Sequence, residues 1–456
     1  MRTAADTRSV LQIAPAIASR RVSPVDLVRT CLAQIDAGRA LNAFITVRET
    51  ESLEEARTAE AEITAGRYRG PLHGVPVSIK DLIDVAGTPT TSGSAVPPRR
   101  PMSDATLVRR LKAAGAIIIG KTNLHEFAFG TTSDETAFGP VRHPRDPSRA
   151  AGGSSGGAAV ALVEGMCFAS VGTDTGGSIR IPSAACGIVG LKPTYGEIPC
   201  DGVVPLSGTL DHAGPMTRTV ADAALLYDIM RGGVPSDIVP VRDRMIFGVP
   251  QGYFFEKLDD DVRRAFRRCS DVLERAGHSL RDVEIPHGAA TADVYLHIVL
   301  PEAASFHAAL LGRYAAKYSP GVRLRLEMGR YVLAEDYVRA MRLRDALTAE
   351  VEHAIGQCDA LLLPGLAVPA PPIGAASVDV GAFKEPVRAA MLRLTQLFNL
   401  TGHPAIVLPA GAGTDGLPRS IQVVGRKDAT ARLLQIAAAV EAHIAAGPGS
   451  VGGGTG

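Results

Sequence analysis

GGSSGG at residues 152–157 and DTGGSIR at residues 174–180 are two glycine- and serine-rich clusters in the first half of the chain. Glycine lets the backbone approach a ligand closely and present its N–H groups to it. A serine beside such groups is suited to be a nucleophile next to an oxyanion hole. The two clusters therefore predict a serine hydrolase.

A serine nucleophile needs a base, and no histidine of the sequence stands out as its partner. Lys80 lies in the stretch GVPVSIKD at residues 74–81, whose alternating Val75, Val77 and Ile79 predict a strand. A lysine held against apolar residues loses its proton more readily and can act as a base near neutral pH. Because Ser–Lys pairs are a known variant of the triad, Lys80 is the candidate base.

These motifs resemble those of the amidase signature family, which hydrolyses amides with a Ser–Ser–Lys triad. The lysine-ending strand, GGSSGG and GTDTGGSIRIP (residues 172–182) occur in the order and spacing of that family. The match is close over residues 66–225. Elsewhere it rests on length and on the late segment FNLTGHP at residues 398–404.

The resemblance implies a role for each residue of the motifs. Ser178 is the expected nucleophile, Lys80 the base, and Ser154, preceded by a cis peptide bond, the serine that bridges them. The other expected site residues are Thr175, Gly176, Gly177 and Ser178 for the oxyanion hole, Ser155 and Asp174 in support, and Phe129, Gly130, Thr131 and Arg180 for substrate binding. Asp174 is also typical of a turn, and Arg180 of a structural ion pair.

Two other motifs are present but lack the surroundings that they need. GAIIIGKT at residues 115–122 matches the P-loop pattern, yet residues 116–119 are themselves an apolar strand and leave no loop for phosphate. Residues 152–156 match the G-x-S-x-G elbow, yet the preceding PRDPSRAA is polar and loop-like. The sequence therefore favours neither a nucleotide hydrolase nor an elbow-type esterase.

Composition is that of an ordinary enzyme rather than of a nucleic-acid-binding or membrane protein. The chain has 456 residues, 46% of them hydrophobic, and a net charge of +1. Six scattered cysteines suggest neither a disulfide framework nor a zinc site. The start lacks a signal segment and no apolar run reaches membrane-spanning length. We expect a cytoplasmic monomer or homodimer that needs no metal and no cofactor.

The alternation of helices with short apolar strands predicts an α/β fold: an amidase-signature-like mixed central sheet covered by helices on both faces, with a helical insertion. The expected parts are a helical segment at 1–65, the signature core at 66–240, a mainly helical insertion at 241–360, the rest of the core at 361–446 and a disordered tail at 447–456. The arginine-rich helices of the insertion are interpreted as a solvated face rather than a ligand site.

The expected substrate is a small amide, anilide or carbamate (urethane), without nucleic acid or membrane as partner. The segment 202–215 is more similar to stand-alone amidases than to the alternative, a glutaminase-type subunit of a tRNA-dependent transamidation complex. Phe127 and Phe129, in a loop that lines the acyl pocket in the family, favour an apolar acyl group. Arg180 is the residue that would instead favour an anion.

Overall fold

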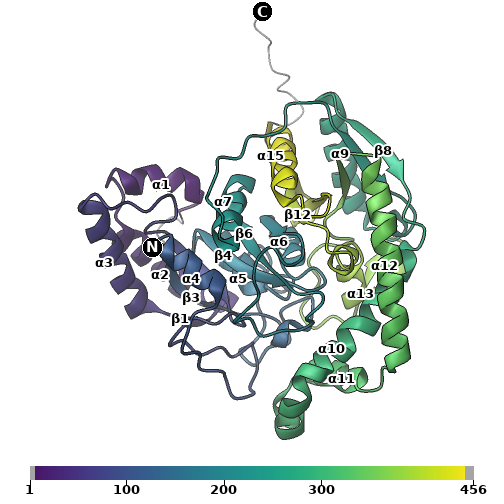
Figure 1. Ribbon diagram of the computed structural model, residues 1–456, viewed down its shortest axis with the longest axis horizontal. Helices are drawn as coiled ribbons and strands as arrows, with labels where there is room; N and C mark the ends of the chain where they lie inside the picture. Colours follow the sequence, from purple (N-terminus) through teal and green to yellow (C-terminus); the bar gives the residue numbers. More distant parts are fainter. Residues whose placement is uncertain (1–5, 447–456) are drawn as a thin grey trace, which may run out of the picture.

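The computed structural model describes residues 6–446, so the predicted tail at 447–456 lies outside the described residues. Within that range the core is a mixed sheet of 11 strands, in the order β1-β3-β2-β4-β6-β5-β12-β13-β9-β7-β8 (Figure 1). In this order the strands span Phe44–Val47, Ile117–Thr122, Pro76–Lys80, Ala169–Asp174, His212–Thr217, Val189–Lys192, Ala405–Ala412, Pro418–Val424, Ala360–Pro364, Ile246–Pro250 and Ser279–Val283. A separate hairpin is made of β10 (Ser377–Val380) and β11 (Phe383–Pro386).

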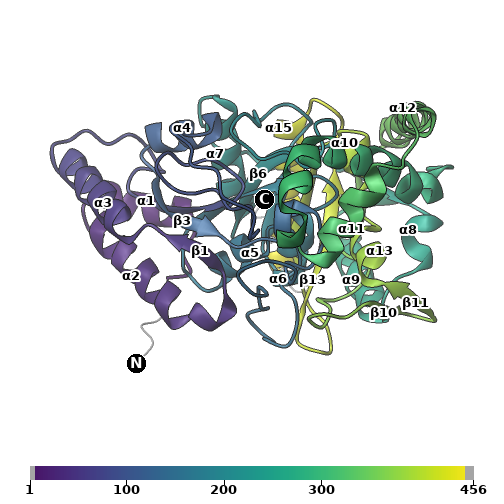
Figure 2. The ribbon, with the colours of Figure 1, turned by 90° about the horizontal axis from the view of Figure 1, so that it is seen from below.

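Helices cover both faces of the sheet, with α7 and α15 on one side and α5 and α6 on the other (Figure 2). The helices α1 to α8 span Val10–Ala18, Pro24–Ala37, Glu49–Thr64, Thr106–Ala113, Gly156–Val163, Arg180–Cys186, Val220–Arg231 and Tyr253–Glu256. The helices α9 to α15 span Asp260–Arg275, Thr291–Tyr314, Pro320–Gly329, Ala334–Gly356, Val387–Leu392, Leu397–Leu400 and Thr430–Ala446. The predicted α/β fold is confirmed.

The centre of the sheet brings together the strands that carry the motifs. β2 is parallel to both neighbours, with Ile79 opposite Val171 of β4 and Lys80 opposite Thr122 of β3. The carboxyl ends of the three strands therefore meet at one edge of the sheet. In open α/β sheets this is the edge outside which ligands bind.

Segment 1–65 contains α1, α2 and α3, but Phe44–Val47 forms β1 and pairs antiparallel with β3. Ser23 caps α2 as its sequence suggests, its hydroxyl accepting hydrogen bonds from the N–H groups of Val25 and Asp26. The segment 241–360 supplies β7 and β8 to the edge of the sheet as well as helices α8 to α12. The division of the chain into parts stays a prediction.

Among residues 6–446, one helical segment, Gly288–Lys317, is long and apolar enough by composition to cross a membrane. Half of the most apolar 18-residue stretch of this segment is buried inside the fold, where α10 packs against α11 and α12. The sequence analysis overlooked this run. Its apolar residues include Val294, Tyr295 and Ile298, which belong to the hydrophobic core.

Candidate active site

Lys80 is the last residue of β2 and is completely buried. Its Nζ lies 2.7 Å from Ser154 Oγ and 2.9 Å from Thr173 Oγ1. Burial lowers the pKa of Lys80 to about 7, although the negative charges of Asp174 and Asp211 oppose the shift. A large fraction of the lysine is therefore neutral at physiological pH.

Ser154 is fully buried in the loop that leads into α5, and its bond to Gly153 is cis. The carbonyl of Ser154 accepts hydrogen bonds from the His125 N–H at 3.1 Å and from Ser133 Oγ at 3.2 Å. Space at Gly153 is tight, because an added Cβ would lie 2.8 Å from the Ser133 nitrogen. The loop before Ser154 is thus packed against the loop that contains Ser133.

Ser178 lies in the turn between β4 and α6 and is 6% exposed. Its carbonyl accepts a hydrogen bond of 3.1 Å from the Ser155 N–H, which joins the two glycine/serine clusters. Gly177 has φ of 142°, and a Cβ there would lie 2.3 Å from Thr395 Oγ1. Only glycine suits this position.

Backbone donors collect around Ser178. Within the described residues, the N–H groups of Gly176, Gly177 and Ser178 donate no hydrogen bond to the protein. The loop is held from outside instead: Thr395 Oγ1 donates to the Gly176 carbonyl at 2.6 Å, and Thr175 Oγ1 donates to Asp211 at 2.6 Å. Unpaired N–H groups in a buried, fixed loop are suited to bind a negatively charged oxygen.

Asp174 and Arg180 form a fully buried ion pair behind this loop. The guanidinium binds both carboxylate oxygens, at 2.9 and 3.0 Å, and also donates to Asn399 and Gln422, each at 2.7 Å. Burial alone would raise the pKa of Asp174, but the charge and hydrogen bonds of Arg180 outweigh it, so the pKa lies below its usual value. Asp174 Oδ2 also accepts from the N–H groups of Ile179 and Arg180, and thereby fixes the turn.

This geometry places Arg180 in a structural network. Its side chain is 0% exposed, and it lines none of the cavities described below. The structure therefore favours the ion-pair alternative for Arg180 over substrate binding.

Replacing Asp174 with alanine leaves the Arg180 charge buried without a partner, so we expect the free energy of unfolding to fall by about 3–5 kcal/mol. Urea denaturation followed by circular dichroism measures the loss. Asp36, in an exposed pair with Arg39, is the matched control, and Asp36→Ala is expected to cost less than about 1 kcal/mol. Equal losses in the two variants would contradict this account.

A cavity of about 360 Å³ is lined by the expected substrate loop and by His125, whose N–H binds the Ser154 carbonyl. The side chains of Lys80, Ser154 and Ser178 do not line it. Gly130 and Thr131 line the cavity, as expected from the sequence. The next lining residue, Thr132, lies against the loop of Ser154, because a Cβ on Gly153 would lie 2.8 Å from its nitrogen. Other lining residues are charged: Asp134, Glu135, Arg325 and Arg388. The wall is therefore more polar than the expected apolar acyl pocket.

Phe129 and Phe127 lie in the wall's interior rather than in the cavity lining. Phe129 is 1% exposed, and the guanidinium groups of Arg325 and Arg388 lie 5.3 and 5.6 Å from the centre of its ring. Phe127 stacks on Tyr318 with ring centres 5.3 Å apart. Both phenylalanines support the wall, and Phe129 positions two cations.

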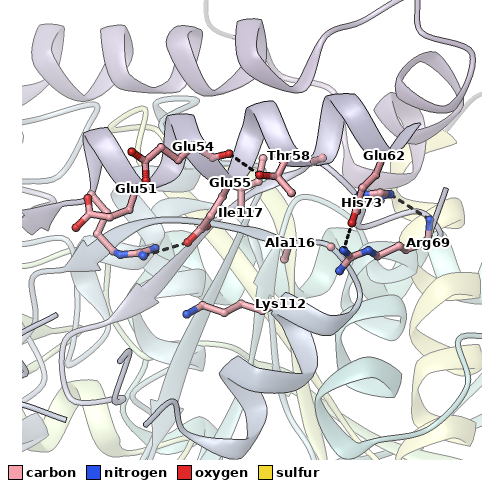
Figure 3. A pocket seen from close by; sticks show the side chains of 13 residues that line it. Glu51, Glu54, Glu55, Thr58, Glu62, Arg69, His73, Lys112, Ala116 and Ile117 are labelled. Atoms are coloured by element: carbon pink, nitrogen blue, oxygen red, sulfur yellow. Dashed lines mark hydrogen bonds and ion pairs between the residues drawn. The ribbon is translucent and has the colours of Figure 1, made fainter. Parts of the chain in front are cut away.

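A second cavity, of about 450 Å³, lies between α3 and β3 (Figure 3). Several of its ionisable side chains pair with one another, as Arg69 does with Glu62 at 2.6 Å and Arg48 with Glu55 at 3.0 Å. The described lining contains no serine, cysteine or lysine other than Lys112, which pairs with Asp104. This cavity has no nucleophile with a base and is not the candidate active site.

Several residues of the site escaped the sequence analysis. Thr173, which contacts Lys80, was visible as part of the second motif. Asn399 lies in FNLTGHP, the late segment of the resemblance, but that segment alone assigns it no role, and no local pattern marks Gln422; both stand more than two hundred residues from Asp174. Arg325 belongs to the helices interpreted as a solvated face, but it reaches the cavity and pairs with Glu135 at 3.3 Å.

The fold and the comparisons with known proteins define an amide hydrolase. A sequence profile described as Amidase matches residues 26–434. An amidase from Pseudomonas putida is 38% identical over 90% of this chain and 90% of its own length. One of the subunits of the glutamyl-tRNA(Gln) amidotransferase of Nitratidesulfovibrio vulgaris is 36% identical over 95% of this chain and 96% of its own length.

A solved structure described as an amidase superposes with a TM-score of 0.91 at 39% identity, covering 95% of this chain and 99% of the other. The chain therefore belongs to the amidase signature family. Its reaction is the hydrolysis of an amide carbon–nitrogen bond.

Proposed function

We propose that this enzyme hydrolyses small amides, including anilides and carbamates, through an acyl-enzyme formed on Ser178. The observation that carries the proposal is the 2.7 Å contact between Lys80 Nζ and Ser154 Oγ. Within the described residues Lys80 has no carboxylate in direct contact, so its neutral form can accept a proton from Ser154 while it donates to Thr173 Oγ1 at 2.9 Å. The proposed relay runs from Ser178 through Ser154 to Lys80, and the Lys80–Ser154 contact supports its second step.

In the first half of the reaction, Ser178 Oγ attacks the amide carbonyl and its proton passes to Ser154, whose own proton passes to Lys80. The backbone N–H groups of Thr175, Gly176, Gly177 and Ser178 stabilise the oxyanion. The tetrahedral intermediate collapses, the carbon–nitrogen bond breaks, and the relay returns a proton to the leaving nitrogen. Water then attacks the acyl-enzyme by the same relay and releases the acid.

Ser155 and Asp174 have supporting roles in this proposal. Ser155 Oγ donates to the Thr173 carbonyl at 3.3 Å, and its N–H binds the Ser178 carbonyl. Asp174 holds the nucleophile turn through Arg180 and two N–H groups. Ser155 and Asp174 thus hold the reacting atoms in place, and neither of the two touches the substrate in this proposal.

Activity is expected to survive exhaustive EDTA treatment, because the N–H donors supply the charge stabilisation that a Lewis acid would otherwise provide. The measurement is ammonia or aniline release from a panel of primary amides, anilides and carbamates before and after dialysis against EDTA. Loss of activity that added Zn²⁺ or Mg²⁺ restores would contradict the mechanism.

The second candidate is the amide-hydrolysing component of a transamidation complex, and the 36% identity to the glutamyl-tRNA(Gln) amidotransferase chain favours it. The same panel, extended with L-glutamine and run on the purified chain alone, separates the two. A stand-alone amidase turns over several simple amides by itself. A transamidation component would hydrolyse glutamine preferentially and would need its partner.

We also propose that the chain works in the cytoplasm, as a monomer or homodimer. All six cysteines are free, five of them buried, as in proteins of reducing compartments. Light scattering of the purified chain measures the oligomeric state.

A further inference from the structure

The cavity beside the Ser154 loop contains a cation that forms no ion pair with the described residues, although the negative charge of Glu135 acts on it at longer range. Arg388, on α13, is partly buried and lines the cavity. Its contact with the Phe129 ring is 5.6 Å, but within residues 6–446 it forms no ion pair and donates no hydrogen bond. Burial lowers the pKa of Arg388 to about 10, so the side chain is still charged at neutral pH. A partly desolvated charge is costly unless a partner compensates it.

The other charged groups of the cavity already have partners in the protein. Glu135 lies 3.3 Å from Arg325 and accepts a hydrogen bond of 3.1 Å from the Gly321 N–H. Asp134 accepts from the Gly374 N–H at 3.0 Å and from a neighbouring threonine hydroxyl. Arg388 is thus the charged group of this wall that is left for a ligand.

The position of Arg388 relates it to the reacting atoms. Leu392 stands four residues later, one turn of about 5.4 Å along α13. A Cβ on Gly176 would lie 3.1 Å from Leu392 Cδ2 and 2.6 Å from the hydroxyl of Tyr295, so this end of the helix borders the oxyanion loop. Another lining residue, Thr132, adjoins the loop of Ser154, since a Cβ on Gly153 would lie 2.8 Å from its nitrogen. Arg388 thus stands about one helical turn from a residue that packs against the oxyanion loop, which is the basis for placing it at the far end of the acyl group.

We propose that the preferred substrates carry a carboxylate at the far end of the acyl group, and that Arg388 binds it. The substrate class is then the monoamide of a dicarboxylic acid. This inference rests on the proposed function, since it places the amide carbonyl at Ser178. It replaces the expected apolar acyl group, and it assigns anion recognition to Arg388 rather than to Arg180.

The test compares succinamate with its neutral isostere 4-oxopentanamide, in which a methyl ketone replaces the carboxylate. For succinamate, Arg388→Met is expected to lower kcat/KM by about 10- to 100-fold, because it removes a charge-assisted hydrogen bond. For 4-oxopentanamide the same variant is expected to change kcat/KM by less than about threefold. Arg330→Met removes an exposed arginine from the end of α11 and is the matched control.

Calorimetry with succinate provides a readout that does not depend on catalysis. Succinate is expected to bind the wild-type enzyme and the Arg330→Met variant, and to lose binding in Arg388→Met at an unchanged thermal midpoint. If no amide is hydrolysed but succinate binds in this pattern, the anion site stands and the proposed function fails. The inference is overturned if the wild-type enzyme has a higher kcat/KM for 4-oxopentanamide than for succinamate. It is also overturned if the Arg388→Met variant has the same kcat/KM for succinamate as the wild type.

Discussion

Ser178→Ala is expected to lower kcat by at least about 10⁴-fold, because the substitution removes the atom that forms the acyl-enzyme. The fold is expected to persist, since the Ser178 contact that joins the two clusters is made by its backbone carbonyl. Single-turnover assays with an anilide measure both the burst of aniline and the steady rate. Both are expected to vanish in the variant.

A matched control is Ser183→Ala, in helix α6 five residues later. Ser183 is equally buried, and its hydroxyl has no hydrogen-bond partner within the described residues. Its replacement is expected to leave the rate within about threefold of the wild type.

A fluorophosphonate probe followed by peptide mapping identifies the nucleophile directly. Label on Ser154 instead of Ser178 would refute the assignment.

Lys80 gives the second large effect. Activity of the wild-type enzyme is expected to fall about tenfold per pH unit below about 7, since the relay requires a neutral lysine and its pKa lies near that value. Above that pH the rate reaches a plateau. Lys80→Met is expected to lose at least about 10³-fold in kcat, because general base catalysis and activation of the nucleophile are lost together. The measurement is the pH dependence of kcat for both proteins.

Stability supplies an independent check of the same residue. The pKa of Lys80 is about 7 in the folded protein against 10.5 for an ordinary lysine, so the unfolded chain binds more protons between these values. Stability of the wild type therefore falls as the pH drops through that window, and Lys80→Met removes this contribution. Urea titrations measure the free energy of unfolding of both proteins at pH 7 and pH 10. Relative to the wild type, the Lys80→Met variant is expected to be more stable at pH 7 than at pH 10. A histidine-modifying reagent that abolishes activity, with Lys80→Met still active, would overturn the model of a lysine base.

Strands of the sheet were predictable from sequence wherever a run of large apolar residues marks them. β2 and β3 lie where such runs occur, around residues 75–79 and 116–119. β4 and β6 contain glycine, serine, threonine and proline, which weaken the apolar signal, and they were not predicted. They are strands because neighbours on both sides supply hydrogen bonds and burial, which is a property of the sheet rather than of the segment.

The residues expected to carry out the chemistry were predictable because they lie in short motifs within about a hundred residues of one another. The cavity wall was not. Arg388 and Arg325 come from helices late in the chain, where an arginine is usually solvated, and only tertiary packing turns them toward Phe129. Local patterns therefore identified the reaction better than the substrate.

The buried network of Asp174 and Arg180 has a consequence for how the enzyme is made. Asn399 and Gln422, which complete the hydrogen bonds of the guanidinium, leave the ribosome long after the nucleophile loop has been synthesised. A nascent or truncated chain that ends before them leaves the Arg180 guanidinium with only its two hydrogen bonds to Asp174. We therefore expect a fragment that carries every catalytic motif but ends before Asn399 to hydrolyse amides poorly, which ties activity to completion of the polypeptide.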